Sequence, residues 1–204
     1  MKHIYLFAFA FILLQACTPG QHNEVLPKLG QYDIDEVSGD TAFHRIRDFS
    51  FVNQDSTLIT NATFEGKIYV MKEFFTSCPT ICPKTAQQML RLYEHYENED
   101  RFSLLAHSID VKRDSVGRLK EYADRLGVSA PKWHFVTGDK DEIYDIASDY
   151  MSIAKEDPDA PGGFDHSGWF ILVDENRHIR SFCNGTDEEA VTKFMKDIDQ
   201  LLKE

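Results

Sequence analysis

Strand and helix patterns alternate along the later two thirds of this 204-residue chain, and their order constrains the fold more than any other feature. The β-rich runs cover residues 67–75, 102–110 and 133–138. Behind these runs, apolar side chains recur at helical spacing within residues 83–93, 115–126 and 143–150. Such alternation predicts a mostly parallel sheet with helices packed on its faces.

Two hairpins and a final helix complete the predicted pattern. Residues 49–60 alternate around an Asp-Ser turn, and residues 168–182 do so around a turn at 174–177. Residues 186–203 carry one long apolar stripe, and Thr186 with Glu189 forms a capping-box pattern at its start. We therefore expect an α/β protein of thioredoxin-like plan, with a central mixed sheet flanked by helices and an N-terminal β-hairpin extension.

Composition indicates the class of protein and argues against one kind of partner. The chain is 42% hydrophobic and 27% charged, which is typical of a globular domain. Its formal net charge of -12 argues against nucleic acid, because proteins bind nucleic acid mainly through Lys and Arg. We expect a single domain over residues 44–204, preceded by a polar and flexible tether over residues 17–43.

The N-terminal residues have the pattern of a lipoprotein signal peptide. An apolar run over residues 4–14 follows Lys2, and it is too short to span a bilayer comfortably. The run leads to Ala16 and Cys17, a junction similar to a lipobox, although Gln15 stands where a small residue is usual. We expect residues 1–16 to be removed and Cys17 to be lipidated; the alternative is ordinary secretory cleavage. The protein is then anchored by lipid to a membrane of the cell envelope, facing outside the cytoplasm.

Cys78 and Cys82 lie at the first predicted junction between a strand and a helix. A helix N-terminus carries free N–H groups and a partial positive charge, which stabilise a thiolate. Residues four apart on one helical turn share a face, about 6 Å apart, which is within disulfide range. Three interpretations compete: a structural staple, a redox couple and a metal clamp. The staple is the weakest, because so short a loop gains little entropy from closure.

The remaining cysteine, Cys183, has no obvious partner. Thiols outside the cytoplasm tend to be oxidised, yet setting Cys17 aside leaves an odd number of three cysteines. Cys183 lies late in the predicted C-terminal hairpin, where a free cysteine usually packs as a small hydrophobic residue. We expect Cys183 to be a bystander.

A metal clamp needs a further ligand, and His166 is the candidate among the eight histidines. It lies in "PGGFDHSGWFIL", where a Pro-Gly-Gly loop leads into a strand and can bend the imidazole over the cysteine pair. Asp165 or a main-chain carbonyl could orient the ring, as metal-binding imidazoles usually require. The other histidines of the domain read as ordinary strand residues (His44, His107, His134) or as solvated surface (His95, His178). The pattern alone leaves the choice between redox couple and metal clamp open.

Four motifs in order make residues 46–204 resemble the Sco/SenC family of thioredoxin-like, membrane-attached copper proteins. They are "FFTSCPTICPKTAQQM", "SIDVKRDSVGRLKEYADRLG", "FVTGD" and "DHSGWFILVDENRHI". The resemblance implies a copper site made of Cys78, Cys82 and His166. Two thiolates and an imidazole suit Cu(I), and the same set takes Cu(II) when a water or carboxylate is added. Structural zinc would require a fourth ligand.

The resemblance also implies a function. The first expectation is a copper metallochaperone that delivers copper to the binuclear centre of respiratory cytochrome c oxidase. The alternative is an exported thiol:disulfide oxidoreductase with Cys78 and Cys82 as its catalytic pair, and a third class is a copper or redox sensor. The expected partners are the copper-bearing oxidase subunit and other copper chaperones or thiol reductases.

Overall fold

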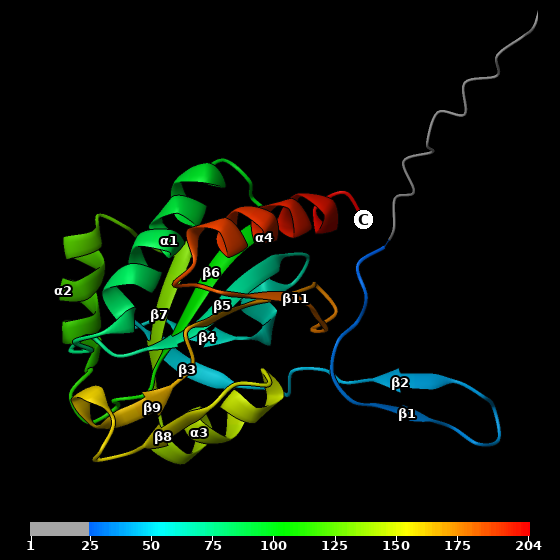
Figure 1. The fold of residues 1–204 in the computed structure, drawn as a ribbon, viewed down its shortest axis with the longest axis horizontal. Helices are drawn as coiled ribbons and strands as arrows, with labels where there is room; N and C mark the ends of the chain where they lie inside the picture. The colour runs from blue at the N-terminus through cyan, green and yellow to red at the C-terminus, as the bar shows by residue number, and fades with distance from the viewer. Residues whose placement is uncertain (1–24) are drawn as a thin grey trace, which may run out of the picture.

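A seven-stranded mixed sheet forms the centre of the computed structural model, which describes residues 25–204. Its strand order is β11-β10-β5-β6-β7-β3-β4, with β5, β6 and β7 parallel and the remaining pairs antiparallel (Figure 1). The strands are β3 (Ser50–Asn53), β4 (Leu58–Thr60), β5 (Ile68–Phe74), β6 (Phe102–Ser108), β7 (Trp133–Thr137), β10 (Trp169–Val173) and β11 (Ile179–Asn184). This arrangement confirms the predicted thioredoxin-like plan and both predicted hairpins.

Helices cover both faces of the sheet. They are α1 (Ile81–His95), α2 (Val116–Leu126), α3 (Lys140–Asp149) and α4 (Glu188–Leu201). Successive side chains of a strand point to opposite faces, so contacts from β5 assign the layers. Lys72 contacts Thr85 of α1, whereas its neighbour Glu73 contacts Ser152, three residues beyond α3. Helix α1 therefore covers one face and the segment after α3 covers the other.

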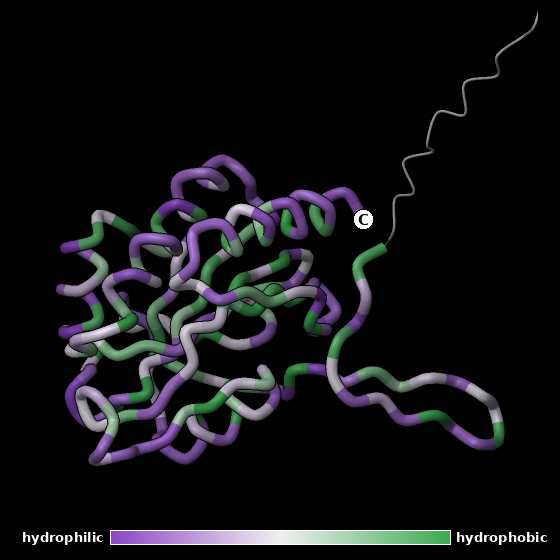
Figure 2. Tube along the Cα trace, in the orientation of Figure 1, coloured by the Kyte–Doolittle hydropathy of each residue, from purple (hydrophilic) through white to green (hydrophobic). Residues whose placement is uncertain are grey.

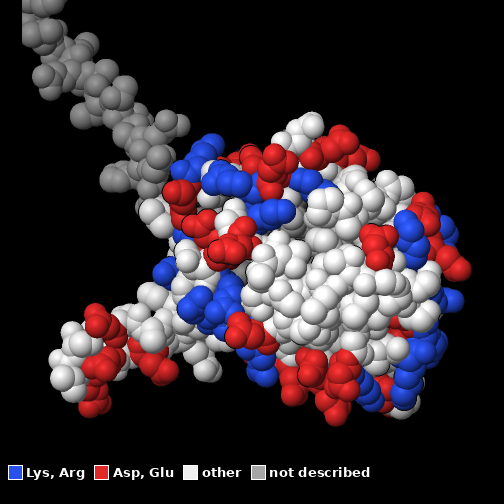
Figure 3. Space-filling model, turned by 180° about the vertical axis from the view of Figure 1, so that it is seen from behind, with Lys and Arg blue, Asp and Glu red and all other residues white. Residues whose placement is uncertain are grey.

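The core lies where the parallel strands are covered on both sides. Every residue of β5 and β6 is buried, which explains why these strands read as continuous runs instead of alternating ones. The hydropathy colours agree, since apolar residues gather along the central strands and hydrophilic residues are frequent in the helices and loops around them (Figure 2). Seen from behind, the molecule has a broad face without Lys, Arg, Asp or Glu, bordered by charged side chains (Figure 3).

The helix starts agree with the sequence in one case and differ in another. Ser115 caps α2 as predicted, because its side chain accepts a hydrogen bond from the Arg118 N–H. The capping box predicted from Thr186 is wrong: Asp187 is the cap of α4, and its carboxylate accepts from the N–H groups of Glu189 and Ala190. A carboxylate at this position also interacts favourably with the positive end of the helix dipole.

The segment expected to be an irregular tether contains a further hairpin. Strands β1 (Tyr32–Ile34) and β2 (Thr41–Phe43) pair antiparallel, and all six residues are exposed. Asp35 makes the turn, because its carboxylate accepts hydrogen bonds from the N–H groups of Val37 and Ser38. Residues 1–16 and Cys17 lie outside the described residues, so the predicted signal peptide and lipidation stay predictions. Over residues 25–204, no helix has the length and apolar character needed to cross a bilayer.

Two short strands that the sequence did not reveal complete the fold. β8 (Ala154–Glu156) and β9 (Phe164–His166) form a separate antiparallel pair, joined through the short helix η2 (Pro161–Gly163). A second short helix, η1 (Asn61–Phe64), follows β4. The β8–β9 pair matters for the site because its last residue is His166.

Candidate metal centre

Both cysteines lie between the end of β5 and the first turn of α1. Strand β5 ends at Phe74, and Cys82 is the second residue of α1. The Cys78 N–H donates to the Phe75 carbonyl at 3.2 Å, which turns the intervening loop back on itself. Cys78 is 8% exposed and Cys82 is 3% exposed, and both are free thiols. The more accessible thiol therefore belongs to the loop and the more buried one to the helix.

Asp114 holds the first part of this loop in place. Its fully buried carboxylate accepts from the Thr76 N–H at 2.9 Å, the Thr76 hydroxyl at 2.5 Å and the Ser108 hydroxyl at 2.6 Å. Arg118 adds a hydrogen bond from Nε to Thr76 Oγ1 at 2.7 Å. Sequence reasoning assigned Asp114 no role. The only available signal was its place in the second motif, "SIDVKRD".

The β8–β9 hairpin brings His166 over the cysteines. The imidazole lies edge-on to the Phe75 ring, with 5.2 Å between ring centroids, and Phe75 also packs on Phe164. Gly162 permits this packing, because it has φ +81° and a Cβ there would lie 2.8 Å from the Phe75 ring. Asp165, one of the two groups that we considered for orienting the imidazole, pairs with Lys155 at 3.4 Å.

The three predicted site residues come together. Nε2 of His166 lies 3.4 Å from Sγ of Cys82 and 3.9 Å from Sγ of Cys78. All three donor atoms lie within 4.8 Å of one another, and no other metal-like cluster of His, Cys, Asp or Glu occurs in residues 25–204. Two sulfur donors and one nitrogen donor match the preferences of a soft ion that accepts three ligands, whereas structural zinc would require a fourth.

The pKa values of the two thiols are shifted in opposite directions. The hydrogen bond from Cys82 lowers the pKa of Cys78 to about 3, with further help from His166 and the Thr80 and Cys82 N–H groups against the effect of burial. The same Cys78–Cys82 contact, followed by burial, raises the pKa of Cys82. The pair therefore shares one proton, with a thiolate on the accessible Cys78 and a thiol on the buried Cys82.

A buried carboxyl group links the strand of His166 to the central sheet. Oε2 of Glu73 accepts from Ser152 Oγ at 2.5 Å and from Ser167 Oγ at 3.4 Å, and the two hydroxyls are 2.6 Å apart. Ser167 follows His166 directly. Burial raises the pKa of Glu73 to about 8, against the opposing effect of the two serine hydroxyls. Glu73 is thus held largely as the neutral acid at pH 7 on the side of the sheet that faces away from α1.

The other candidate residues lie outside the cluster. His95 is exposed, as predicted, and His44 hydrogen-bonds the Asp149 carbonyl. The prediction for His178 is wrong: it is buried, and its Nδ1 lies 2.9 Å from the His44 carbonyl oxygen. His134 pairs with Asn53, and burial lowers the pKa of His107 to about 3. Cys183 is buried in β11, where burial raises its pKa to about 12.

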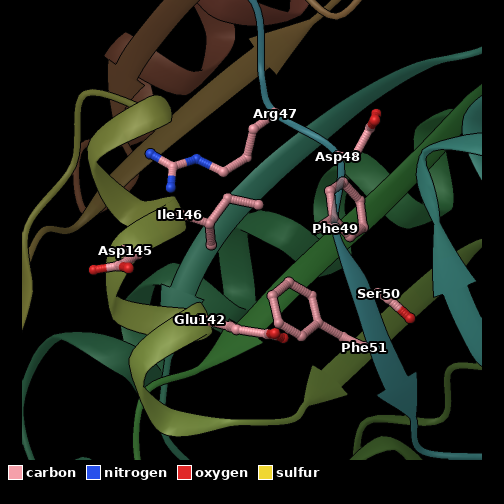
Figure 4. A pocket seen from close by; sticks show the side chains of 8 residues that line it. All are labelled: Arg47, Asp48, Phe49, Ser50, Phe51, Glu142, Asp145 and Ile146. Carbon is pink, nitrogen blue, oxygen red and sulfur yellow. The ribbon is translucent and has the colours of Figure 1, made fainter.

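A separate cavity of about 400 Å³ lies between the segment around β3 and helix α3. Arg47, Asp48, Phe49, Ser50, Phe51, Glu142, Asp145 and Ile146 line it, as Figure 4 shows. Arg47 is engaged elsewhere, since its guanidinium forms a 2.6 Å ion pair with Asp149. None of the three clustered donor residues contributes to this cavity.

Comparison with known proteins gives a consistent family assignment. A model of the SCO1/SenC family matches residues 38–203. A SCO2-like protein of Rickettsia conorii is 26% identical over 198 residues, which cover 92% of this chain and 88% of that protein. The SCO1 protein homolog of Bacillus subtilis is 24% identical over 157 residues, covering 76% and 81% of the two chains.

Solved structures of similar fold agree with this assignment. A SCO1/SenC family lipoprotein from Bacillus anthracis has a TM-score of 0.70 at 23% identity, over 78% of this chain and 95% of that one. BsSco, described as a cytochrome c oxidase assembly protein with a disulfide switch, has a TM-score of 0.68 at 25% identity, over 78% and 93%. Copper-bound ScoI of Arabidopsis thaliana has a TM-score of 0.63 at 24% identity, over 76% and 98%.

Proposed function

The chain belongs to the SCO1/SenC family, and from that premise we propose that it is a copper metallochaperone for the assembly of cytochrome c oxidase. One observation carries the proposal: Cys78, Cys82 and His166 place two sulfur atoms and one nitrogen within 4.8 Å of one another. A structural relative is known with copper bound, and another is an oxidase assembly protein. The cargo is Cu(I), and the same donors take Cu(II) when a further ligand is added.

The three donors have different parts in receiving and releasing the ion. The Cys78 thiolate is the more accessible sulfur and is ionised before copper arrives, so it is the first ligand to meet the ion. Cys82 loses its proton when it binds, and His166 contributes a neutral nitrogen. A three-coordinate ion leaves room for a ligand of the accepting protein. The acceptor, which we take to be the copper-bearing oxidase subunit, can then replace these ligands one at a time.

The thiol pair favours a second candidate, a thiol:disulfide oxidoreductase. The Cys78 thiolate attacks a partner disulfide, forms a mixed disulfide and expels one partner thiolate. Cys82 then loses its proton and attacks Cys78 Sγ, which releases the second partner thiolate and leaves a Cys78–Cys82 disulfide. The partner gains two electrons and the pair loses two. The oxidised pair cannot hold copper, so the two activities exclude each other in time.

Substituting His166 separates the two functions. In His166→Ala, Cu(II) binding should be almost lost, and Cu(I) affinity should fall about tenfold because two thiolates remain. Disulfide exchange should persist, since it uses only the cysteines. Chelator competition, a thiol-exchange assay and oxidase assembly in cells give the three readouts. His95→Ala, on the exposed side of α1, is the control. Normal oxidase assembly in His166→Ala cells would contradict the metallochaperone function and favour the thiol:disulfide oxidoreductase.

We further propose that Cys17 carries the lipid that anchors the protein outside the cytoplasm. A related SCO1/SenC protein of Bacillus anthracis is a lipoprotein, which supports this placement. Cys17→Ser should move the protein from the membrane fraction to the soluble fraction and abolish fatty-acid labelling. Cys183→Ser, at a buried position of the domain, should change neither. A Cys17→Ser protein that stays in the membrane fraction with normal labelling contradicts the anchor.

A further inference from the structure

Lys72 lies buried beneath the start of α1, beside the cysteine pair. Its side chain comes from β5 and is 4% exposed. Nζ donates to Thr85 Oγ1 at 2.5 Å, and the Thr85 hydroxyl donates in turn to the Cys82 carbonyl at 3.2 Å. The amino group is therefore two hydrogen bonds away from the main chain of a copper-ligand residue.

A buried ammonium group needs a negative charge nearby, because isolation from water is costly. None of the ion pairs found in residues 25–204 includes Lys72, and its neighbour Glu73 points to the other face of the sheet. Thr85 is neutral. Burial lowers the pKa of Lys72, and the charges that oppose this effect are those of Cys82 and Cys78 as thiolates, the form that both take when they bind copper. The sulfur atoms of the copper site are thus the counter-charge of this lysine.

We propose that Lys72 is a specificity-determining residue that makes this site favour Cu(I) over Cu(II). The inference rests on the proposed copper function. Two thiolates and a neutral imidazole around Cu(I) carry a single negative charge, which the Lys72 ammonium neutralises. The same ligands around Cu(II) are neutral, so the ammonium leaves a net positive charge in a buried site. The Cu(II) state is therefore the less stable of the two.

The Cu(I)-loaded and Cu(II)-loaded forms of the site differ by one electron on the metal. Reduction of bound Cu(II) takes one electron from an external one-electron donor, and neither thiolate nor the imidazole gains or loses a proton. The effect of Lys72 is therefore electrostatic. It differs from the effect of a residue that merely shapes the site, which would change the affinity for both ions in parallel.

Lys72→Met tests this inference, because methionine fills similar space without the charge. The ratio of Cu(I) to Cu(II) association constants should fall at least about tenfold, since the charge acts through the buried interior, where electrostatic interactions are stronger than in water. Each tenfold change lowers the midpoint potential of bound copper by about 59 mV. Competition with a Cu(I)-selective and a Cu(II)-selective chelator gives the ratio, and spectroelectrochemical titration gives the potential. Lys84→Met is the control, because it removes an exposed charge from the first turn of α1. It should leave the ratio of association constants and the midpoint potential unchanged.

The outcomes distinguish this inference from the proposed function. Absence of copper binding by the wild-type protein would refute the proposed function itself. Normal wild-type binding with an unchanged ratio and potential in folded Lys72→Met would refute only the role of Lys72. A parallel loss of both affinities would assign Lys72 to shape and also overturn the inference. Circular dichroism reports folding, and Lys72→Gln, which keeps a donor for Thr85, undergoes the same measurements if Lys72→Met does not fold.

Discussion

At the scale of single residues, adjacent side chains on β5 serve opposite faces of the sheet. Lys72 points toward α1 and the cysteines, and Glu73 points toward the serines beside His166. The sequence shows "KE" within an otherwise apolar strand, but this dipeptide carries no periodic signal. Their roles could not be predicted, because they depend on which tertiary neighbours cover each face. Cys78, Cys82 and His166 could be predicted as candidates, because their motifs lie at element boundaries that the sequence pattern marks.

Glu73 makes stability depend on pH in a direction unusual for a carboxyl group. Its pKa is raised from an ordinary value to about 8 in the folded chain, so the folded state binds more protons between about pH 4.5 and 8. Stability contributed by this proton is present at low pH and is lost as pH rises through that window. Glu73→Gln should remove the loss and stabilise the protein at pH 7 by about 2 kcal/mol. Urea unfolding of the wild type and the variant at pH 5, 7 and 8.5 measures this difference in unfolding free energy.

Substitution of an exposed carboxyl group is the control for this experiment. Glu142→Gln removes a carboxyl group from the first turn of α3, where it is exposed to solvent. Its stability profile should keep the wild-type decline between pH 5 and 8. If the Glu73→Gln profile also keeps the full decline, Glu73 does not hold the proton assigned to it.

At the scale of secondary-structure elements, those with a marked sequence pattern could be predicted, whereas two pairs of short strands could not. Strands β5, β6 and β7 and all four helices match the sequence expectation. The β1–β2 and β8–β9 pairs have three-residue strands, which are too short to show alternation. Turn chemistry fixes the first pair and packing on Phe75 positions the second. Neither can be recognised from hydrophobic periodicity.

Gly162 should be essential to the placement of β9. Gly162→Ala forces a methyl group to within 2.8 Å of Phe75 and also strains a backbone with φ +81°. We expect a loss of about 1–3 kcal/mol in unfolding free energy. Copper affinity should fall as well, because His166 moves with Phe75. Denaturant unfolding and chelator competition are the measurements.

The neighbouring glycine provides the control. Gly163 has φ +88°, but a Cβ at that position meets no atom within 4 Å. Gly163→Ala therefore reports backbone strain without the collision. Equal effects of the two substitutions on copper affinity would show that contact with Phe75 does not position His166.

At the scale of the whole molecule, the domain is linked to its N-terminal segment by few contacts. Leu29 pairs with Ile179 of β11, and Arg180 donates to the carbonyl oxygens of Leu26 and Pro27. The β1–β2 hairpin extends beyond these contacts, away from the sheet (Figure 1). Sequence reasoning placed the start of the domain near residue 44, and it missed the contacts made by residues 26–29 because they depend on distant partners.

Shortening the hairpin should leave the domain intact. We expect replacement of residues 32–42 by two glycines to change the unfolding free energy by less than about 1 kcal/mol, because these residues are exposed and Phe43, whose ring packs edge-on to His178, is kept. Thermal unfolding and chelator competition should give wild-type values. Leu29→Asp, which places a charge where the segment packs on the core, should lower stability. A large loss of copper affinity in the shortened protein would contradict this view of the hairpin.

Because the donors of the site are far apart along the chain, they are not synthesised at the same time. Cys82 precedes His166 by 84 residues. At ordinary translation rates of about 5–20 residues per second, roughly 4–17 s pass between the two. In that interval the nascent chain carries a dithiol without its imidazole, open to oxidants and to metals of the wrong kind. Capture of copper by all three donors is therefore possible only after His166 has been added, and a loaded site shows that synthesis has passed this residue and that β9 has folded over the cysteines.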